Sequence, residues 1–150
     1  MRVVIQRVSR VVVSSNQYGT SRIGEGLLVL LGIEETDSES DVAWLVGKIS
    51  RLRIFSDADG VMNLSVMDVN GSIMVVSQFT LHASTRKGNR PSYIRAARPE
   101  TAIPMYEMFV EQLKQSTGLE VQTGWFGAMM QIELINDGPV TIIIDSKDKE

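Results

Sequence analysis

The run from Gly26 to Ile33 (GLLVLLGI) contains no polar side chain that would mark a solvent-facing side. Such a run is typical of a strand that is covered on both faces, so other elements must pack on either side of it. The chain has 150 residues, and a chain of this size buries about 70% of its unfolded surface. The sequence therefore predicts one domain over residues 1–150, in which residues 146–150 form a frayed polar tail.

Two segments have helical spacing, and the rest of the pattern predicts strands. Thr36 and Glu39 form a capping box before the first helix, and Pro99 opens a second helix that ends at Gly118. Asn70-Gly71 is the strongest short hairpin signal in the chain. Because the order is not repeating β-α-β, we expect an α+β domain, a mostly antiparallel and barrel-like sheet with two main helices. The predicted strands cover residues 1–8, 11–15, 26–33, 52–55, 62–69, 72–79, 129–135 and 140–145.

The composition excludes several classes of active site. There is no cysteine and only one histidine, His82, so thiol chemistry, disulfides and a clustered metal site are excluded, and we expect no cofactor. A base role for His82 toward Thr80 competes with an incidental loop position, which we favour. The first residues lack a signal-peptide core, and no apolar run reaches the ~20 residues of a membrane span. We therefore expect a cytoplasmic protein that does not contact a membrane.

The charge is unevenly distributed along the chain. The net charge is −3, yet residues 69–99 contain no Asp or Glu. A basic segment on an acidic chain is typical of a phosphate-contacting patch, although a solvated loop fits the charge equally well. The cations of this segment are Arg86, Lys87, Arg90, Arg95 and Arg98.

Two further segments are unusual for their positions. In residues 77–81 (SQFTL) an apolar strand turns abruptly polar, and its hydroxyls and free backbone N–H groups suit an oxyanion or a ribose. In residues 136–141 (NDGPVT) a Gly-Pro pair permits unusual backbone geometry, including a cis bond. A plain strand end and an ordinary hairpin turn are the alternative interpretations of these two segments.

SQFTL and NDGPVT together resemble the signature pair of the D-aminoacyl-tRNA deacylase family, also called the D-Tyr-tRNA deacylase family. The similarity extends over residues 1–145 without large gaps. Trp125 departs from it, because arginine is typical at that position, and this leaves any RNA contact there open. The other matching segments are MRVVIQRV at 1–8, GLLVLLGI at 26–33, LRIF at 52–55, MNLSV at 62–66, RKGNRPSY at 86–93 and WFGAMMQIELINDGPVT at 125–141.

The resemblance implies a homodimer in which a Gly-cisPro motif, here Gly138 and Pro139, enters the active site of the other subunit. Arg7 would support the motif, and we assign the same role to Asn136. The receiving pocket would be formed by Ser77, Gln78, Phe79 and Thr80. We also place Met129 in the pocket, although a methionine on a strand is more often a core residue. Arg86, Lys87 and Arg90 would contact phosphates of the tRNA acceptor end.

The resemblance also implies the reaction, which is hydrolysis of the ester of D-aminoacyl-tRNA, and of glycine mischarged on tRNA(Ala), to give free amino acid and tRNA. This is chiral proofreading, a form of translation quality control. The backbone N–H groups of Phe79 and Thr80 would stabilise the oxyanion while the 2′-hydroxyl of the terminal adenosine assists, with no metal. The Thr80 side chain is a weaker catalytic candidate because the sequence offers it no convincing base.

Two other functions fit the residues. One is a nucleic-acid or nucleotide-binding module without catalysis, in which the basic loop binds. The other is an esterase that acts on small molecules through Thr80. Turnover of D-aminoacyl-tRNA separates the deacylase hypothesis from both of these.

Overall fold

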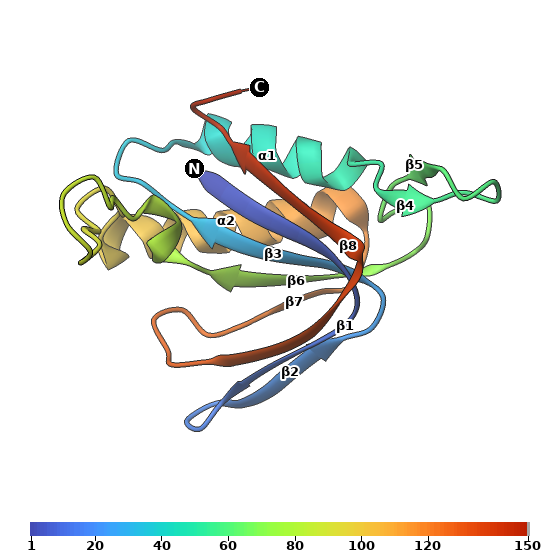
Figure 1. Cartoon of the computed structure of the whole chain (residues 1–150), viewed down its shortest axis with the longest axis horizontal. Helices are drawn as coiled ribbons and strands as arrows, with labels where there is room; N and C mark the ends of the chain where they lie inside the picture. The colour runs from blue at the N-terminus through green and yellow to red at the C-terminus, as the bar shows by residue number, and fades with distance from the viewer. Residues whose placement is uncertain (150) are drawn as a thin grey trace.

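The computed structural model describes residues 1–149 and consists of one strongly curved six-stranded sheet, two long helices against it and a separate two-stranded sheet (Figure 1). None of the helices described is long and apolar enough to cross a membrane. The elements are β1 (Arg2–Ser15), β2 (Gly19–Ile23), β3 (Gly26–Gly32), α1 (Glu39–Arg51), β4 (Phe55–Ser56), β5 (Met62–Leu64), β6 (Ser72–Ser77), the 3₁₀ helix η1 (Phe79–His82), α2 (Pro99–Thr117), β7 (Val121–Thr123) and β8 (Gln131–Asp145).

The long strand β1 organises the sheet. β3 and then β2 pair with one edge of β1 in antiparallel register, and β8 pairs with its other edge. Beyond β3 the order continues through β6 to β7, both in parallel register. Ser21 on β2 and Gln122 on β7 meet at 3.4 Å, so the sheet is nearly closed. The expected α+β fold is confirmed.

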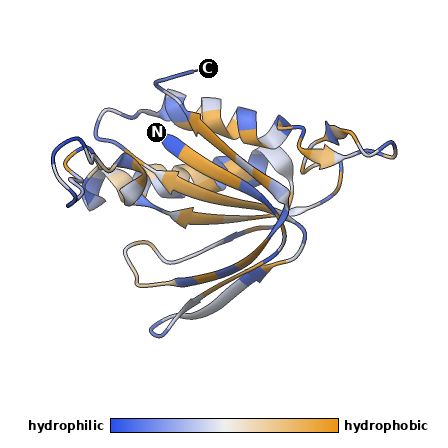
Figure 2. Ribbon diagram, in the orientation of Figure 1, coloured by the Kyte–Doolittle hydropathy of each residue, from blue (hydrophilic) through white to orange (hydrophobic). Residues whose placement is uncertain are grey.

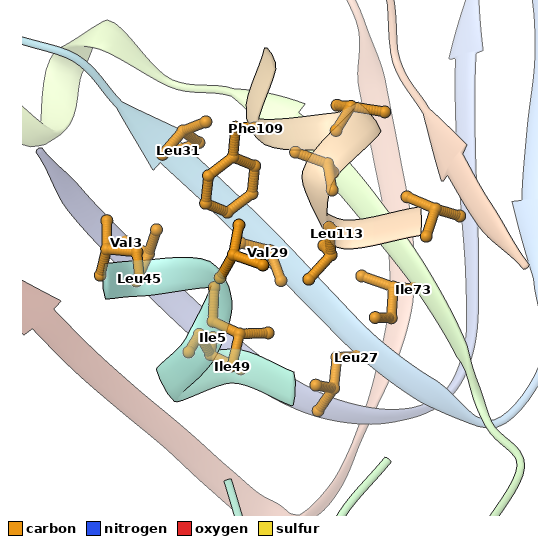
Figure 3. Packing of buried hydrophobic residues seen from close by; sticks show 14 of the residues in the cluster. Val3, Ile5, Leu27, Val29, Leu31, Leu45, Ile49, Ile73, Phe109 and Leu113 are labelled. Atoms are coloured by element: carbon orange, nitrogen blue, oxygen red, sulfur yellow. The ribbon is translucent and has the colours of Figure 1, made fainter. Parts of the chain in front are cut away.

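The sheet is buried on both faces along β3. On one face, Leu45 and Ile49 of α1 and Phe109 and Leu113 of α2 pack against the strands, as Figure 3 shows. On the other face, a second cluster that includes Leu28 fills the inside of the curve. Hydrophobic residues accordingly concentrate along β1, β3 and β6 (Figure 2). The two-sided burial predicted for the GLLVLLGI run is confirmed.

The Asn70-Gly71 hairpin prediction is wrong. β5 ends at Leu64, residues 66–70 form a turn, and the Gly71 amide donates to the Val66 carbonyl oxygen at 2.9 Å. β6 then pairs with β3 in parallel register instead of returning along β5. Burial of the IMVV segment between two neighbouring strands prevails over the local turn preference.

Four element boundaries also differ from the sequence prediction. The first helix is capped by Ser38 with Asp41, not by Thr36 with Glu39, because Ser38 and Asp41 exchange the two capping-box contacts. The strands predicted over 1–8 and 11–15 are one strand, as are those over 129–135 and 140–145. The strand predicted over 52–55 is the short β4.

The last residues described lie against helix α1. Ser146 is buried, and the Lys147 ammonium pairs with the Asp41 carboxylate at 2.7 Å. The predicted tail is therefore not frayed at Ser146 and Lys147, whereas Glu150 lies outside the described residues. Burial raises the pKa of Asp41, but hydrogen bonds from Lys147, Ser146 and Ser38 outweigh that effect and hold it below its usual value.

Asp41→Asn should lower the free energy of unfolding by about 1–3 kcal/mol at neutral pH, because it removes a charged hydrogen-bond acceptor. Since the Asp41 pKa is lowered on folding, its ionised form contributes fully above about pH 5 and loses that contribution as the pH falls further. Urea unfolding at several pH values would show the two proteins converging in acid. Glu39→Gln, on the same helical turn but exposed, should change the stability by less than about 1 kcal/mol. A difference that persists unchanged below pH 3 would contradict this account.

Candidate active site

The parallel pairing of β3 with β6 brings the carboxyl ends of two buried strands to one edge of the sheet. Leu31 lies opposite Ser77, and the Gln78 amide donates to the Leu31 carbonyl oxygen at 2.7 Å. A small cavity of ≈ 70 Å³ opens at this edge. Its lining consists of Leu31, Ile33, Ser77, Gln78, Phe79, Ala97, Ala102, Phe126 and Gly127.

The polar end of β6 leads directly into the short helix η1, which carries Phe79 and Thr80. The Gln78 side-chain amide donates to the Thr80 hydroxyl oxygen. Phe79 is 57% exposed and packs edge-on against Tyr93 of the following loop, with ring centroids 5.1 Å apart. Ser77, Gln78 and Phe79 line the cavity, and Thr80 lies next to them without lining it.

The sequence predicts that His82 is an incidental loop residue, and this prediction is wrong. His82 is the last residue of η1. Its imidazole is fully buried, and Nδ1 lies 3.1 Å from Oε1 of Glu34. Arg95 reaches the same oxygen at 2.6 Å. His82 therefore faces Glu34 and not Thr80, so no Thr80–His82 dyad forms. The Glu34 carboxylate instead joins η1 to the basic segment.

The basic segment forms a loop that is closed by paired backbone hydrogen bonds between Ser84 and Ser92, at 2.8 and 2.9 Å. Arg86, Lys87 and Arg90 are exposed in this loop, and none of them makes an ion pair with a residue of the described chain. Arg95 and Arg98, which follow this loop, are also exposed, but Arg95 pairs with Glu34 and the backbone amide of Arg98 is bonded to Glu35.

The carboxylate of Glu35 fixes the base of the loop where it enters α2. It accepts hydrogen bonds from the Arg98 backbone amide at 2.7 Å and from the Thr101 hydroxyl at 2.9 Å. These two bonds lower the pKa of Glu35 below its usual value. The loop is therefore held at both ends of its base, and its three exposed cations project beyond it.

The second motif lies within β8, where Gly138 and Pro139 are exposed and joined by a cis peptide bond. Arg7 holds the turn through its guanidinium, which donates to the Asp137 carbonyl oxygen at 3.0 Å and to the Ile54 carbonyl oxygen at 2.6 Å. Asn136 bonds both the amide and the carbonyl of Val140. The turn is thus fixed from both sides and faces outward.

The two motifs of one chain lie far apart. The Gly-Pro turn interrupts the β1–β8 pairing opposite Arg7, whose partner on β3 is Leu27. The cavity lies at Leu31, four residues further along β3, which corresponds to about 13 Å along the strand. A single copy of the chain therefore does not bring Gly138 to its own cavity.

Met129 does not line the small cavity. It is 91% exposed and lines a separate hollow with residues 14–17 at the far end of β1. It is therefore not a core residue either. Residues 1–149 contain no group of three His, Cys, Asp or Glu side chains placed to hold a metal ion.

Gly32 lies in close contact with η1 and with the residue before it. A Cβ at Gly32 would lie 3.0 Å from His82 and from Leu81 and 3.1 Å from the Gln78 carbonyl oxygen, whereas a Cβ at Gly24 would meet nothing within 4 Å. Gly32→Ala should therefore destabilise the fold by about 1–3 kcal/mol and shift the amide resonances of Phe79 and Thr80, and Gly24→Ala should do neither. Urea unfolding and ¹H–¹⁵N spectra measure both effects. Unmoved resonances in Gly32→Ala would contradict this packing.

The chain is similar over its whole length to members of one protein family. A family described as D-Tyr-tRNA(Tyr) deacylase matches residues 4–145. Proteins named "D-aminoacyl-tRNA deacylase" from Flavobacterium johnsoniae and Akkermansia muciniphila are 60% and 61% identical, and each alignment covers 100% of both chains.

Two solved structures have the same fold. One, described as "c-Myc DNA Unwinding Element Binding Protein", has a TM-score of 0.90 at 42% identity and covers 97% of this chain and 98% of its own. The other, described as a probable eukaryotic D-amino acid tRNA deacylase, has a TM-score of 0.82 at 18% identity, covers 95% and 97%, and supports the fold alone. With a family match from residue 4 to residue 145 and relatives at about 60% identity, the chain belongs to the D-Tyr-tRNA(Tyr) deacylase family.

Proposed function

We propose that the protein hydrolyses the ester bond of D-aminoacyl-tRNA, releasing the D-amino acid and the tRNA. The observation that carries this proposal is the combination of a rigid, outward-facing Gly-Pro turn with a small cavity lined by Ser77, Gln78 and Phe79 at the start of η1. Full-length relatives named for this activity support it. A cytoplasmic location and independence of metal remain predictions from the sequence.

A second copy of the chain supplies the Gly-Pro turn to the cavity. The turn and the cavity of one chain are separated along the strands, and the turn is exposed. β8 pairs only with β1 among the described strands, and it presents the exposed side chains of Ile135 and Ile143. Uncovered apolar residues on an unpaired edge favour association with an identical surface. This arrangement supports a homodimer.

Selectivity in this proposal arises by steric exclusion. If the cavity fixes the ammonium, the carbonyl and the Cα of the substrate, two positions remain on Cα. Carbonyl oxygens of Gly138 and Pro139 from the second copy occupy the space beside one position, so only hydrogen fits there. An L side chain clashes with this wall, whereas a D side chain points outward and glycine passes, including glycine on tRNA(Ala).

Catalysis does not depend on an ionisable side chain. The Thr80 hydroxyl oxygen accepts a hydrogen bond from the Gln78 side chain, and His82 is buried against Glu34. The backbone N–H groups of Phe79 and Thr80 stabilise the oxyanion, and the 2′-hydroxyl of the terminal adenosine assists the attack. Arg86, Lys87 and Arg90 supply phosphate contacts from the exposed loop.

Gly138→Ala should reduce the deacylation rate of D-aminoacyl-tRNA by about tenfold or more, because a misplaced wall disturbs the reacting geometry. A Cβ there would lie 2.8 Å from Val140 and 2.9 Å from Arg7, on backbone with φ +133°. Gly60→Ala is the matched control, since Gly60 also has positive φ (+77°) but open space around it. Matched D- and L-charged tRNA provide the measurement. An unchanged rate together with an unchanged D-over-L preference in Gly138→Ala would remove the turn from the mechanism.

Thr80→Ala should retain a deacylation rate within about tenfold of the unaltered protein, because its backbone N–H remains in place. A substrate that ends in 2′-deoxyadenosine should react roughly 100-fold more slowly or worse, because it lacks the assisting hydroxyl. Single-turnover rates with the two substrates measure both effects. An inactive Thr80→Ala that still binds tRNA normally would reverse the assignment and make the threonine hydroxyl the reacting group.

A nucleic-acid-binding function without catalysis is the second candidate. The exposed cations of the loop favour it, and one related structure is described as a DNA unwinding element binding protein. The deacylation assay separates the two, because a binding module would retain D-aminoacyl-tRNA without releasing the amino acid. Hydrolysis of simple esters without tRNA would instead indicate an esterase that acts on small molecules.

A further inference from the structure

A groove of ≈ 510 Å³ lies beside the small cavity, between helix α2 and the segment that follows β7. Trp125 lines this groove, and its ring is stacked on the exposed ring of Tyr18, with 5.9 Å between the ring centroids and 14° between the planes. Phe126 lines both the groove and the cavity. A ligand that reacts at the cavity can therefore extend past Phe126 into the groove.

The aromatic surface of the groove is held in place before any ligand arrives. The Trp125 amide donates to the Met130 sulfur at 3.3 Å, and the Trp125 carbonyl oxygen accepts from the Ala128 amide at 3.1 Å. Phe126 packs edge-on against Tyr106, whose hydroxyl is bonded to the Val75 carbonyl oxygen. Little ordering of the protein is then required when a flat ring stacks on Trp125.

The charges along the groove select a base over a phosphate. Glu107, Glu111 and Lys114 line it from α2. Glu111 accepts a hydrogen bond from Gln115 at 2.8 Å, whereas Glu107 has no hydrogen-bond partner within residues 1–149. Two carboxylates oppose the approach of a phosphate, but a carboxylate readily accepts a hydrogen bond from the exocyclic amino group of a nucleobase.

We propose that this groove binds the unpaired base of the nucleotide that precedes the terminal adenosine of tRNA, stacked on Trp125. The inference rests on the deacylase function proposed above, because the ester at the cavity fixes where the next nucleotide must lie. Sequence-tolerant binding of single-stranded nucleotides depends on stacking of this kind. The groove thereby recognises that the substrate is the end of an RNA and not a free amino acid ester.

The first test measures binding without catalysis. A fluorescently labelled, uncharged trinucleotide CCA should bind Trp125→Ala about tenfold more weakly than the unaltered protein, whereas Trp125→Phe should bind it within about threefold. A trinucleotide with an abasic middle position should bind the unaltered protein as weakly as CCA binds Trp125→Ala. Equal binding of CCA and the abasic trinucleotide by the unaltered protein would overturn the proposal.

The second test measures turnover. Trp125→Ala should raise the KM for D-aminoacyl-tRNA about tenfold with little change in kcat, and it should leave hydrolysis of D-aminoacyl-adenosine, which lacks the preceding nucleotide, unchanged. An equal loss on both substrates would show that Trp125 only supports the cavity, and would overturn the proposal. A protein that binds CCA through Trp125 but hydrolyses neither substrate would support the groove and contradict the deacylase function. Hydrolysis of both substrates with no effect of Trp125→Ala would support the deacylase function and overturn the proposal for the groove.

Discussion

The parallel pairing of β3 with β6 determines where chemistry can occur in this fold. Each strand is buried on both faces, and their shared register places Leu31 beside Ser77. Everything that follows these strands therefore emerges at the same edge, with Glu34 after β3 and Phe79 to His82 after β6. Since both strand ends are fixed by packing on the two helices and on the inner cluster, the backbone of η1 has little freedom to shift.

The buried side chain of His82 holds the short helix η1 in place, so the backbone N–H groups of η1 keep a fixed orientation. His82 fills the space against Gly32, and Glu34 connects it to Arg95 at the base of the basic loop. Tyr93 from the same loop packs on Phe79. The loop and the turn are thus linked by direct contacts. Preorganised backbone dipoles of this kind suit a reaction that uses no acidic or basic side chain.

Elements fixed by local chemistry could be predicted from the sequence, and those fixed by distant packing could not. The buried strand at 26–33 and the Pro99 helix follow from periodicity and capping residues, and both are present. The Asn70-Gly71 signal fails because β6 gains more by burial beside β3 than by a hairpin with β5. His82 was misjudged for the same reason, since its partners Glu34 and Arg95 are remote in sequence. The first helix is capped by Ser38 in place of the predicted Thr36, a shift of two residues.

The separation of the two motifs is the feature that sequence order conceals most completely. Residues 77–81 and 136–141 read as two parts of one site, yet the register of β1 against its neighbours places them at different positions along the sheet. The proposed site, assembled from two copies, is more demanding than one built within a chain, because its wall would be rigid only where Arg7 and Asn136 hold the turn in each copy. Exclusion by main-chain atoms is well suited to this arrangement. A backbone wall offers no side-chain rotamer that could turn aside to admit an L residue, so in the proposed mechanism the discrimination would depend on the stiffness of the turn and on the fit between the two copies.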